Sequence, residues 1–119
     1  MLNGIETSGQ GRVYFYRNPL LGFGSAIQSD IKLNGENVGK CEANGVFFID
    51  LPPGDYHVSV ASEVERTLNF TLEKGEEKFV RCYLKPNFVT TGHLIVELVD
   101  STEAREEMRE LAYTGRKLE

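Results

Sequence analysis

The sequence predicts a mainly β protein, an antiparallel β-sandwich of seven or eight short strands that ends in one amphipathic helix. Apolar and polar residues alternate with a period of two in several stretches, which is the pattern of a half-buried strand. These stretches recur roughly every 8–12 residues with Gly, Pro and Asn between them, a spacing typical of a sandwich or small barrel. Near the C-terminus the period changes to that of a helix.

The polar segment 1–11 is expected to be a flexible leader or linker, followed by a single domain over residues 12–117. "RVYFYR" opens the domain as a strand, because Val13 and Phe15 alternate with Tyr14 and Tyr16. The next stretch, "NPLLGFGSAIQS", has no clean period and is rich in Gly and Pro, so we expect a loop.

Two turns are expected in the middle of the chain. "DIKLNGENVGKC" predicts a hairpin, because Asn34 and Gly35 both tolerate the positive φ of a type I′ turn. The strand "VFFIDL" ends at "PPG", where Pro53 suits the first central position of a type II turn and Gly54 supplies the positive φ that follows. The next strand is expected to place Tyr56, Val58 and Val60 on one face, and His57, Ser59 and Ala61 on the other.

The last part of the chain predicts three more strands and a helix. The strands are "TLNFTL", "KFVRCYL" and "HLIVELV". The helix is expected from about residue 101 to 114, because Asp100 can cap it with Glu103 in a capping box. Gly115 is expected to end it, and we expect it to cover one edge or face of a sheet. Its apolar stripe consists of Ala104, Met108, Leu111 and Ala112.

The charge pattern narrows the range of partners. The net charge is -5 and Lys and Arg form no block, which argues against nucleic acid or an anionic membrane surface. No apolar run approaches the roughly 18 residues of a membrane-spanning helix. The first residues lack the basic and apolar regions of a secretory signal.

A series of motifs runs through the chain in order: "RVYFYR", "GSA", "KLNGENVG", "GVFFIDLPPGDYHVSV", "FVRCYL", and "LVD" before an acidic helix. Over about residues 11 to 115 this series resembles a bacterial family of unknown function that is common among small envelope lipoproteins. The hairpin and PPG portion is also similar to PEGA-type and carboxypeptidase-regulatory modules, which are non-catalytic β-sandwiches.

The resemblance implies a prealbumin-like or Ig-like sandwich and, for lipoprotein members, export and attachment through an N-terminal lipidated cysteine. No cysteine precedes the domain here, since Cys41 lies inside it. We therefore expect membrane contact only through an N-terminal lipid anchor that is absent from this chain.

Two residue pairs could support catalysis. Asp55 with His57, or Cys82 with His93, would suit a small hydrolase, which is one alternative reading of the chain. Residues two apart on a strand lie about 6.6 Å from each other, and no nucleophile is specified beside His57, so we expect no catalytic residue. The two cysteines and two histidines, Cys41 among them, fall on separate strands, whereas zinc ligands usually come in close pairs. We expect no metal and no cofactor.

The sequence leaves the state of Cys41 and Cys82 open. In an oxidising compartment they could form a disulfide. Each also occupies a strand position where a small apolar residue would serve, and buried free thiols are the commoner outcome.

The first strand and the following loop carry the candidate partner-binding residues. Tyrosine and arginine dominate binding hot spots, and apolar side chains in an exposed loop would mark a partner site. The alternatives are that the tyrosines pack beneath the helix and that the loop plugs the open end of the sandwich. The candidates are Arg12, Tyr14, Tyr16, Arg17, Leu20, Leu21 and Phe23.

These observations favour a non-catalytic binding or structural module of the bacterial cell envelope, in the periplasm or anchored to the outer membrane. Its partner would be a protein, peptide or glycan of the envelope, recognised by a rigid sheet surface. Besides the hydrolase, the remaining alternative is a cytoplasmic protein-interaction domain whose strands bind another chain edge to edge.

Overall fold

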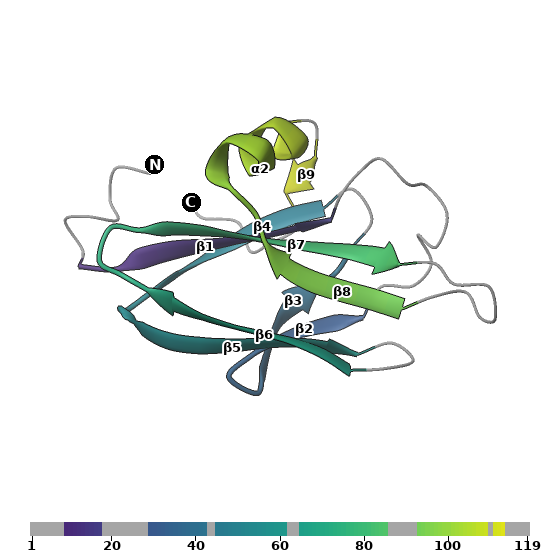
Figure 1. The fold of residues 1–119 in the computed structure, drawn as a ribbon, viewed down its shortest axis with the longest axis horizontal. Helices are drawn as coiled ribbons and strands as arrows, with labels where there is room; N and C mark the ends of the chain where they lie inside the picture. Colours follow the sequence, from purple (N-terminus) through teal and green to yellow (C-terminus); the bar gives the residue numbers. More distant parts are fainter. Residues whose placement is uncertain are drawn as a thin grey trace.

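The computed structural model describes residues 9–17, 29–42, 45–61, 65–85, 93–109 and 111–113. Over these ranges the chain forms two packed β-sheets, and one helix covers the outer face of the larger sheet (Figure 1). The predicted sandwich with a C-terminal helix is confirmed. The elements are β1 Gly11–Arg17, β2 Asp30–Leu33, β3 Glu36–Lys40, β4 Gly45–Leu51, β5 Gly54–Ala61, β6 Glu65–Leu72, β7 Glu77–Lys85, β8 His93–Leu98, α2 Ser101–Met108 and β9 Ala112–Tyr113.

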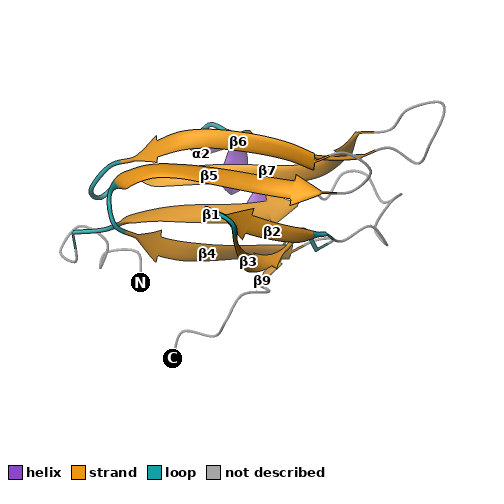
Figure 2. Ribbon diagram, turned by 90° about the horizontal axis from the view of Figure 1, so that it is seen from below, coloured by secondary structure: helices purple, strands orange, loops and turns teal. Residues whose placement is uncertain are grey.

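The two sheets differ in strand direction. The four-stranded sheet, in the order β3-β2-β5-β6, is antiparallel throughout. The five-stranded sheet, in the order β8-β7-β1-β4-β9, is mixed, because β1 pairs with β7 and β4 with β9 in parallel. A parallel pair needs a long crossover, and between β1 and β7 the chain forms β2 to β6, of which only β4 belongs to the same sheet (Figure 2).

The main core lies between the sheets and consists of side chains from alternate strand positions. Phe15 of β1 stacks on Phe47 of β4, with ring centroids 5.0 Å apart. On β5, Val58 and Val60 are fully buried while His57 and Ala61 are exposed, in agreement with the predicted alternation, and Ser59 between them is buried as well. Each buried side chain of this size contributes about 1.5–3 kcal/mol.

The Asn-Gly hairpin forms as predicted. Asn34 has φ of 50° and Gly35 has φ of 88°, the two positive values that a type I′ turn needs. The turn is also fastened to β5, because Asn34 Oδ1 accepts the backbone N–H of His57 at 2.8 Å. The Asn34 N–H donates in return to the His57 carbonyl at 2.7 Å.

The predicted type II turn at "PPG" is wrong. Gly54 is not among the positive-φ glycines of the described residues; it is already extended and pairs with Leu72. The reason is that β4 and β5 belong to different sheets, so the prolines form a corner between sheets rather than a hairpin. The hydroxyl of Tyr56 closes this corner by donating to the Pro52 carbonyl at 2.6 Å.

The helix begins as predicted but ends earlier. Asp100 caps it by accepting the N–H groups of Thr102 at 3.0 Å and Glu103 at 3.4 Å. It ends at Met108 instead of about residue 114, and Ala112 lies in β9 rather than on the helical stripe. Pairing of this segment with the open edge of β4 satisfies its backbone groups in the sheet, which overrides the helical pattern. Gly115 lies outside the described residues.

The expectation of buried free thiols is wrong, because Cys41 and Cys82 form a disulfide. Their Cα atoms lie 6.2 Å apart, and their exposed fractions are 2% and 1%. Cys41 follows β3 of the four-stranded sheet and Cys82 belongs to β7 of the five-stranded sheet. Both side chains point into the same core, so two positions that each suit a small apolar residue become one covalent link between the sheets.

Candidate functional site

The predicted tyrosines lie on the outer face of the five-stranded sheet, beneath α2. Tyr14 and Tyr16 are 7% and 2% exposed. Tyr14 stacks on Phe79 with ring centroids 4.9 Å apart, and Tyr16 donates its hydroxyl proton to Glu107 of the helix at 2.5 Å. They belong to a second apolar cluster that also includes Ala104 of α2. The structure therefore agrees with the alternative in which the tyrosines pack beneath the helix.

The two predicted arginines are also buried, each 5% exposed. Arg12 forms a bidentate ion pair with Asp50, at 2.5 Å and 2.8 Å, and this hydrogen bonding raises the pKa of Arg12. Its guanidinium lies 4.0 Å from the ring centroid of Phe48. Arg17 donates to the Cys41 carbonyl at 3.1 Å, and burial lowers the pKa of Arg17.

As a correction to the sequence interpretation, Arg12, Tyr14, Tyr16 and Arg17 therefore form no exposed contact surface. All seven residues of β1 are buried, because this strand is covered by the core on one face and by the second cluster on the other. The other candidates, Leu20, Leu21 and Phe23, lie outside the described residues.

Arg81 of β7 holds α2 on the sheet. It contacts three carboxylates, Glu97 at 2.5 Å, Glu107 at 3.0 Å and Glu103 at 3.1 Å. Burial opposes the charge of Arg81, but these hydrogen bonds outweigh it and raise its pKa. Burial, and next the hydrogen bond to Glu107, raise the pKa of Tyr16. The sequence offered one signal for this network, the four-residue spacing that puts Glu103 and Glu107 on one helix face.

Asp55 and His57, the first candidate pair, have different hydrogen-bonding partners. Both are exposed on the outer face of β5, and each contacts a different residue of β6. His57 Nδ1 lies 2.6 Å from Asn69 Oδ1, and the Thr71 hydroxyl donates to Asp55 at 2.7 Å. These are cross-strand contacts on an open sheet face. The second pair is also unsuitable, because the disulfide leaves Cys82 without a free thiol.

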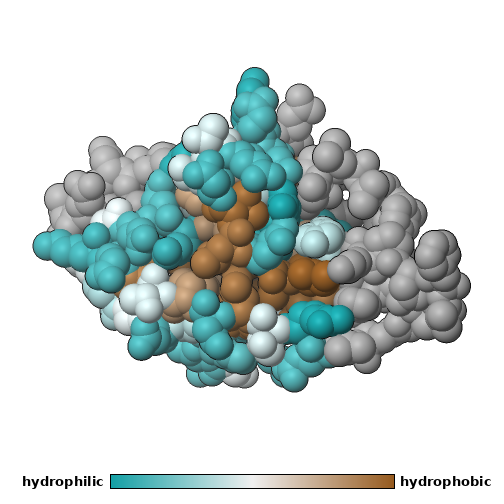
Figure 3. All heavy atoms as spheres, viewed as in Figure 1, coloured by the Kyte–Doolittle hydropathy of each residue, from teal (hydrophilic) through white to brown (hydrophobic). Residues whose placement is uncertain are grey.

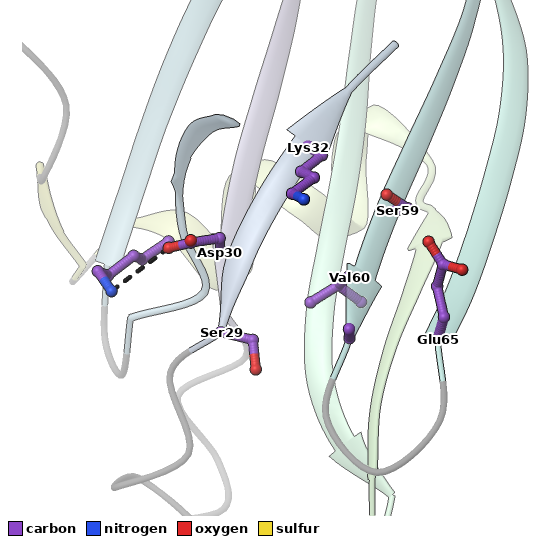
Figure 4. A pocket seen from close by; sticks show the side chains of 8 residues that line it. Ser29, Asp30, Lys32, Ser59, Val60 and Glu65 are labelled. Atoms are coloured by element: carbon purple, nitrogen blue, oxygen red, sulfur yellow. Dashed lines mark ion pairs between the residues drawn. The ribbon is translucent and has the colours of Figure 1, made fainter. Parts of the chain in front are cut away.

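The four-stranded sheet has a hollow near each end. One, of about 330 Å³, lies beside His57 and Asn69. The other, of about 400 Å³, contains charges of both signs, including the Asp30–Lys40 ion pair at 3.3 Å (Figure 4). Its lining residues are Ser29, Asp30, Lys32, Lys40, Ser59, Val60, Ala61 and Glu65.

A model of the family described as "Protein of unknown function (DUF2846)" matches residues 7–93, which is most of the chain. The chain belongs to this family. Among curated proteins, none matches it. The predicted membership of a family of unknown function is thus confirmed, and the match includes both cysteines and strands β1 to β7. All of β8 but its first residue, helix α2 and β9 follow the region that the family model matches.

Two kinds of feature are absent from the described ranges of the DUF2846 domain. No helix there is long and apolar enough to cross a membrane. In the same ranges, no three His, Cys, Asp or Glu side chains gather in a way that could hold a metal ion.

One edge of the five-stranded sheet carries exposed apolar surface. β8 is the first strand of the five-stranded sheet, and within the described residues no strand pairs with its other side. The last residue of β8 is Leu98. Among the described residues it is the large hydrophobic side chain that is exposed, with an exposed fraction of 40%. Figure 3 shows hydrophobic surface on this side of the molecule, between α2 and the four-stranded sheet.

Proposed function

We propose that this DUF2846 domain is a non-catalytic binding or structural module of the bacterial cell envelope. The observation that carries the proposal is the buried disulfide between Cys41 and Cys82. Disulfides form and persist in secreted and periplasmic proteins and are rare in the cytosol, where thiols are kept reduced. The disulfide therefore favours an oxidising compartment over the cytoplasmic alternative.

The position of the disulfide also suits a rigid binding module. It joins the two sheets of the sandwich, which are also held together by apolar packing and by the hydrogen bond from Arg17 to the Cys41 carbonyl. A sandwich fixed in this way presents its outer faces and edges in a constant geometry, which lowers the entropic cost of binding. The partner would be a protein, peptide or glycan of the envelope.

Attachment to a membrane would use an N-terminal lipid anchor carried outside these residues, as the resemblance to envelope lipoproteins implies. The PEGA-like and prealbumin-like resemblance supports the non-catalytic part of the proposal, because those modules are β-sandwiches without catalysis. The separate contacts of Asp55 and His57 also support it, since neither residue is oriented by the other.

The experiment measures location and thiol state in the native host. Cells are quenched in acid, fractionated, and treated under denaturing conditions with a maleimide reagent that adds mass to each free thiol. We expect the protein in the envelope fraction, with no thiol modified until a reductant is added. Recovery of the protein in the cytosol with both cysteines modified would contradict the proposal. A Cys41→Ala, Cys82→Ala variant is the control, because it has no thiol to react and shows the mass of the unmodified protein.

A further inference from the structure

The hollow of about 330 Å³ on the four-stranded sheet lies beside the turn between β2 and β3. β2 ends at Leu33, opposite Val58, so the first residues of β5 extend past this turn and pair with β6. The hollow lies at this step, and exposed polar side chains line it. They are those of Asn34, Asp55, His57, Asn69 and Thr71.

Three hydrogen bonds hold these polar groups in place. Asn34 Oδ1 accepts the backbone N–H of His57 at 2.8 Å. His57 Nδ1 lies 2.6 Å from Asn69 Oδ1. The Thr71 hydroxyl donates to Asp55 Oδ1 at 2.7 Å. The side chains are therefore ordered before a ligand arrives, which lowers the entropic cost of binding.

Four of these side chains keep a second polar atom for a ligand. A carbonyl oxygen only accepts, so the proton of the His57–Asn69 contact is on Nδ1, and Nε2 of the neutral His57 ring is an acceptor. Asp55 Oδ2 is a second acceptor, and the Nδ2 amino groups of Asn34 and Asn69 are donors. Within the part of the chain that the structure describes, none of these four atoms has a partner. The hollow therefore combines donors and acceptors in a small area.

The lining argues against other classes of ligand. No lysine or arginine is among the described lining residues, so the hollow provides no cation for a phosphate or a carboxylate. Asp55 and His57 are two metal-ligating side chains, whereas a zinc site needs about four ligands. Tyr56 and Phe70 also line the hollow, but they pack against the core and are not available as apolar anchors for a peptide. A neutral ligand rich in hydroxyl groups fits these observations best.

We propose that this hollow binds a neutral glycan through two adjacent hydroxyl groups of one sugar ring. A hydroxyl group donates one hydrogen bond and can accept two. Each of the two hydroxyls can therefore donate to an acceptor, Asp55 or His57, while it accepts from an asparagine amino group. The bond to the charged Asp55 carboxylate contributes most, because hydrogen bonds to charged groups are stronger than those between neutral groups. This inference rests on the proposed binding function and names the class of ligand.

The test uses three immobilised neutral polysaccharides, mannan, galactan and dextran, whose adjacent hydroxyls differ in geometry. Binding of the full chain is measured by biolayer interferometry, and we expect at least one polysaccharide to bind. The control ligand is the same polysaccharide after periodate oxidation and borohydride reduction, which break the carbon–carbon bond between adjacent hydroxyls and leave primary alcohols. Its binding is expected to be at least about tenfold weaker.

Two isosteric variants reverse the ligand-facing atoms of the hollow. Asp55→Asn turns the free acceptor into a donor, and Asn69→Asp turns the free donor into an acceptor, while each keeps the oxygen that bonds the facing strand. Each is expected to weaken binding at least about tenfold. The matched controls Glu65→Gln and Asn37→Asp make the same chemical changes at exposed positions outside this hollow, and they are expected to change binding less than about twofold. Thermal unfolding confirms that all four variants are folded.

Nuclear magnetic resonance locates the sugar on the protein. The side-chain amide signals of Asn34 and Asn69 are expected to shift when the monosaccharide of the bound polysaccharide is added, and that of Asn37 is expected to stay in place. Signals that shift elsewhere but not at Asn34 and Asn69 would place the sugar outside the hollow and contradict the inference.

Four binding results would also overturn the inference. They are that no polysaccharide binds, that the oxidised polysaccharide binds as well as the intact one, that either isosteric variant binds as well as the wild type, or that a mixture of short peptides but not the monosaccharide releases the bound protein. The last result would mean that the hollow takes a peptide. None of these results depends on thiol state or cell fraction, so the inference can fail while the envelope proposal stands.

Discussion

Opening the Cys41–Cys82 disulfide is expected to lower the unfolding free energy of the domain by about 4 kcal/mol. The cross-link joins residues separated by 41 positions. In the chain-entropy model, a loop of that length removes about 13 cal/mol/K from the unfolded chain, which is about 4 kcal/mol at room temperature. A domain of this size has about 5–15 kcal/mol in total, so the loss is a large share.

The assay is urea unfolding followed by circular dichroism, with and without a thiol reductant. The Cys41→Ala, Cys82→Ala double variant is the control, because it cannot respond to the reductant. It is expected to match the reduced wild type within about 1 kcal/mol. If oxidised and reduced protein differ by less than about 1 kcal/mol, the cross-link does not restrict the unfolded chain and the reasoning is refuted.

Three further predictions concern single side chains. Arg81→Gln is expected to cost about 1–3 kcal/mol in urea unfolding and to speed amide exchange in α2, because it removes the anchor of the helix. The matched control Arg109→Gln removes an exposed pair within the helix and is expected to cost less than about 0.5 kcal/mol. The pKa of Tyr16 is raised in the folded state above its ordinary value of 10.0. The stabilisation of the fold that this shift provides is therefore complete below pH 10.0, and it is lost as the pH rises through the folded pKa. Tyr16→Phe should flatten this alkaline loss in unfolding measured at several pH values, and an unchanged slope would contradict it. Gly39→Ala is expected to cost about 1–3 kcal/mol, because the new Cβ would lie 2.5 Å from a core aromatic ring. Gly54→Ala, whose Cβ meets its nearest atom at 3.9 Å, is expected to change stability by less than about 0.5 kcal/mol.

The features that the sequence predicted correctly are those decided by residues close together in the chain. The alternation around Val58 and Val60 depends only on the geometry of one strand. The hairpin at Asn34 and Gly35 depends on two residues that tolerate positive φ. The start of α2 depends on Asp100, whose carboxylate reaches two neighbouring N–H groups.

The features that it predicted wrongly are decided by distant partners. Gly54 is extended because the chain passes from one sheet to the other there. The residues "PPG" alone do not indicate whether the strands on either side of them belong to the same sheet. The helix stops early because the edge of β4 is available to residues 112–113. For "RVYFYR" the strand itself forms as predicted, and of the two interpretations of its tyrosines the structure agrees with packing beneath the helix, a choice that depends on where α2 lies. The pairing of Cys41 with Cys82 depends on how two sheets pack, which their spacing does not reveal.

The central place of β1 has a consequence for how the molecule is made. Of the described strands, β1 is synthesised first, and all seven of its residues end up buried between β4 and β7. Its pairing with β7 joins Arg12 to Glu77, so it cannot be completed until most of the chain has been synthesised. Until then the side chains of β1 lack the neighbours that β7 and α2 supply, so the unfinished chain exposes apolar and aromatic surface that favours aggregation.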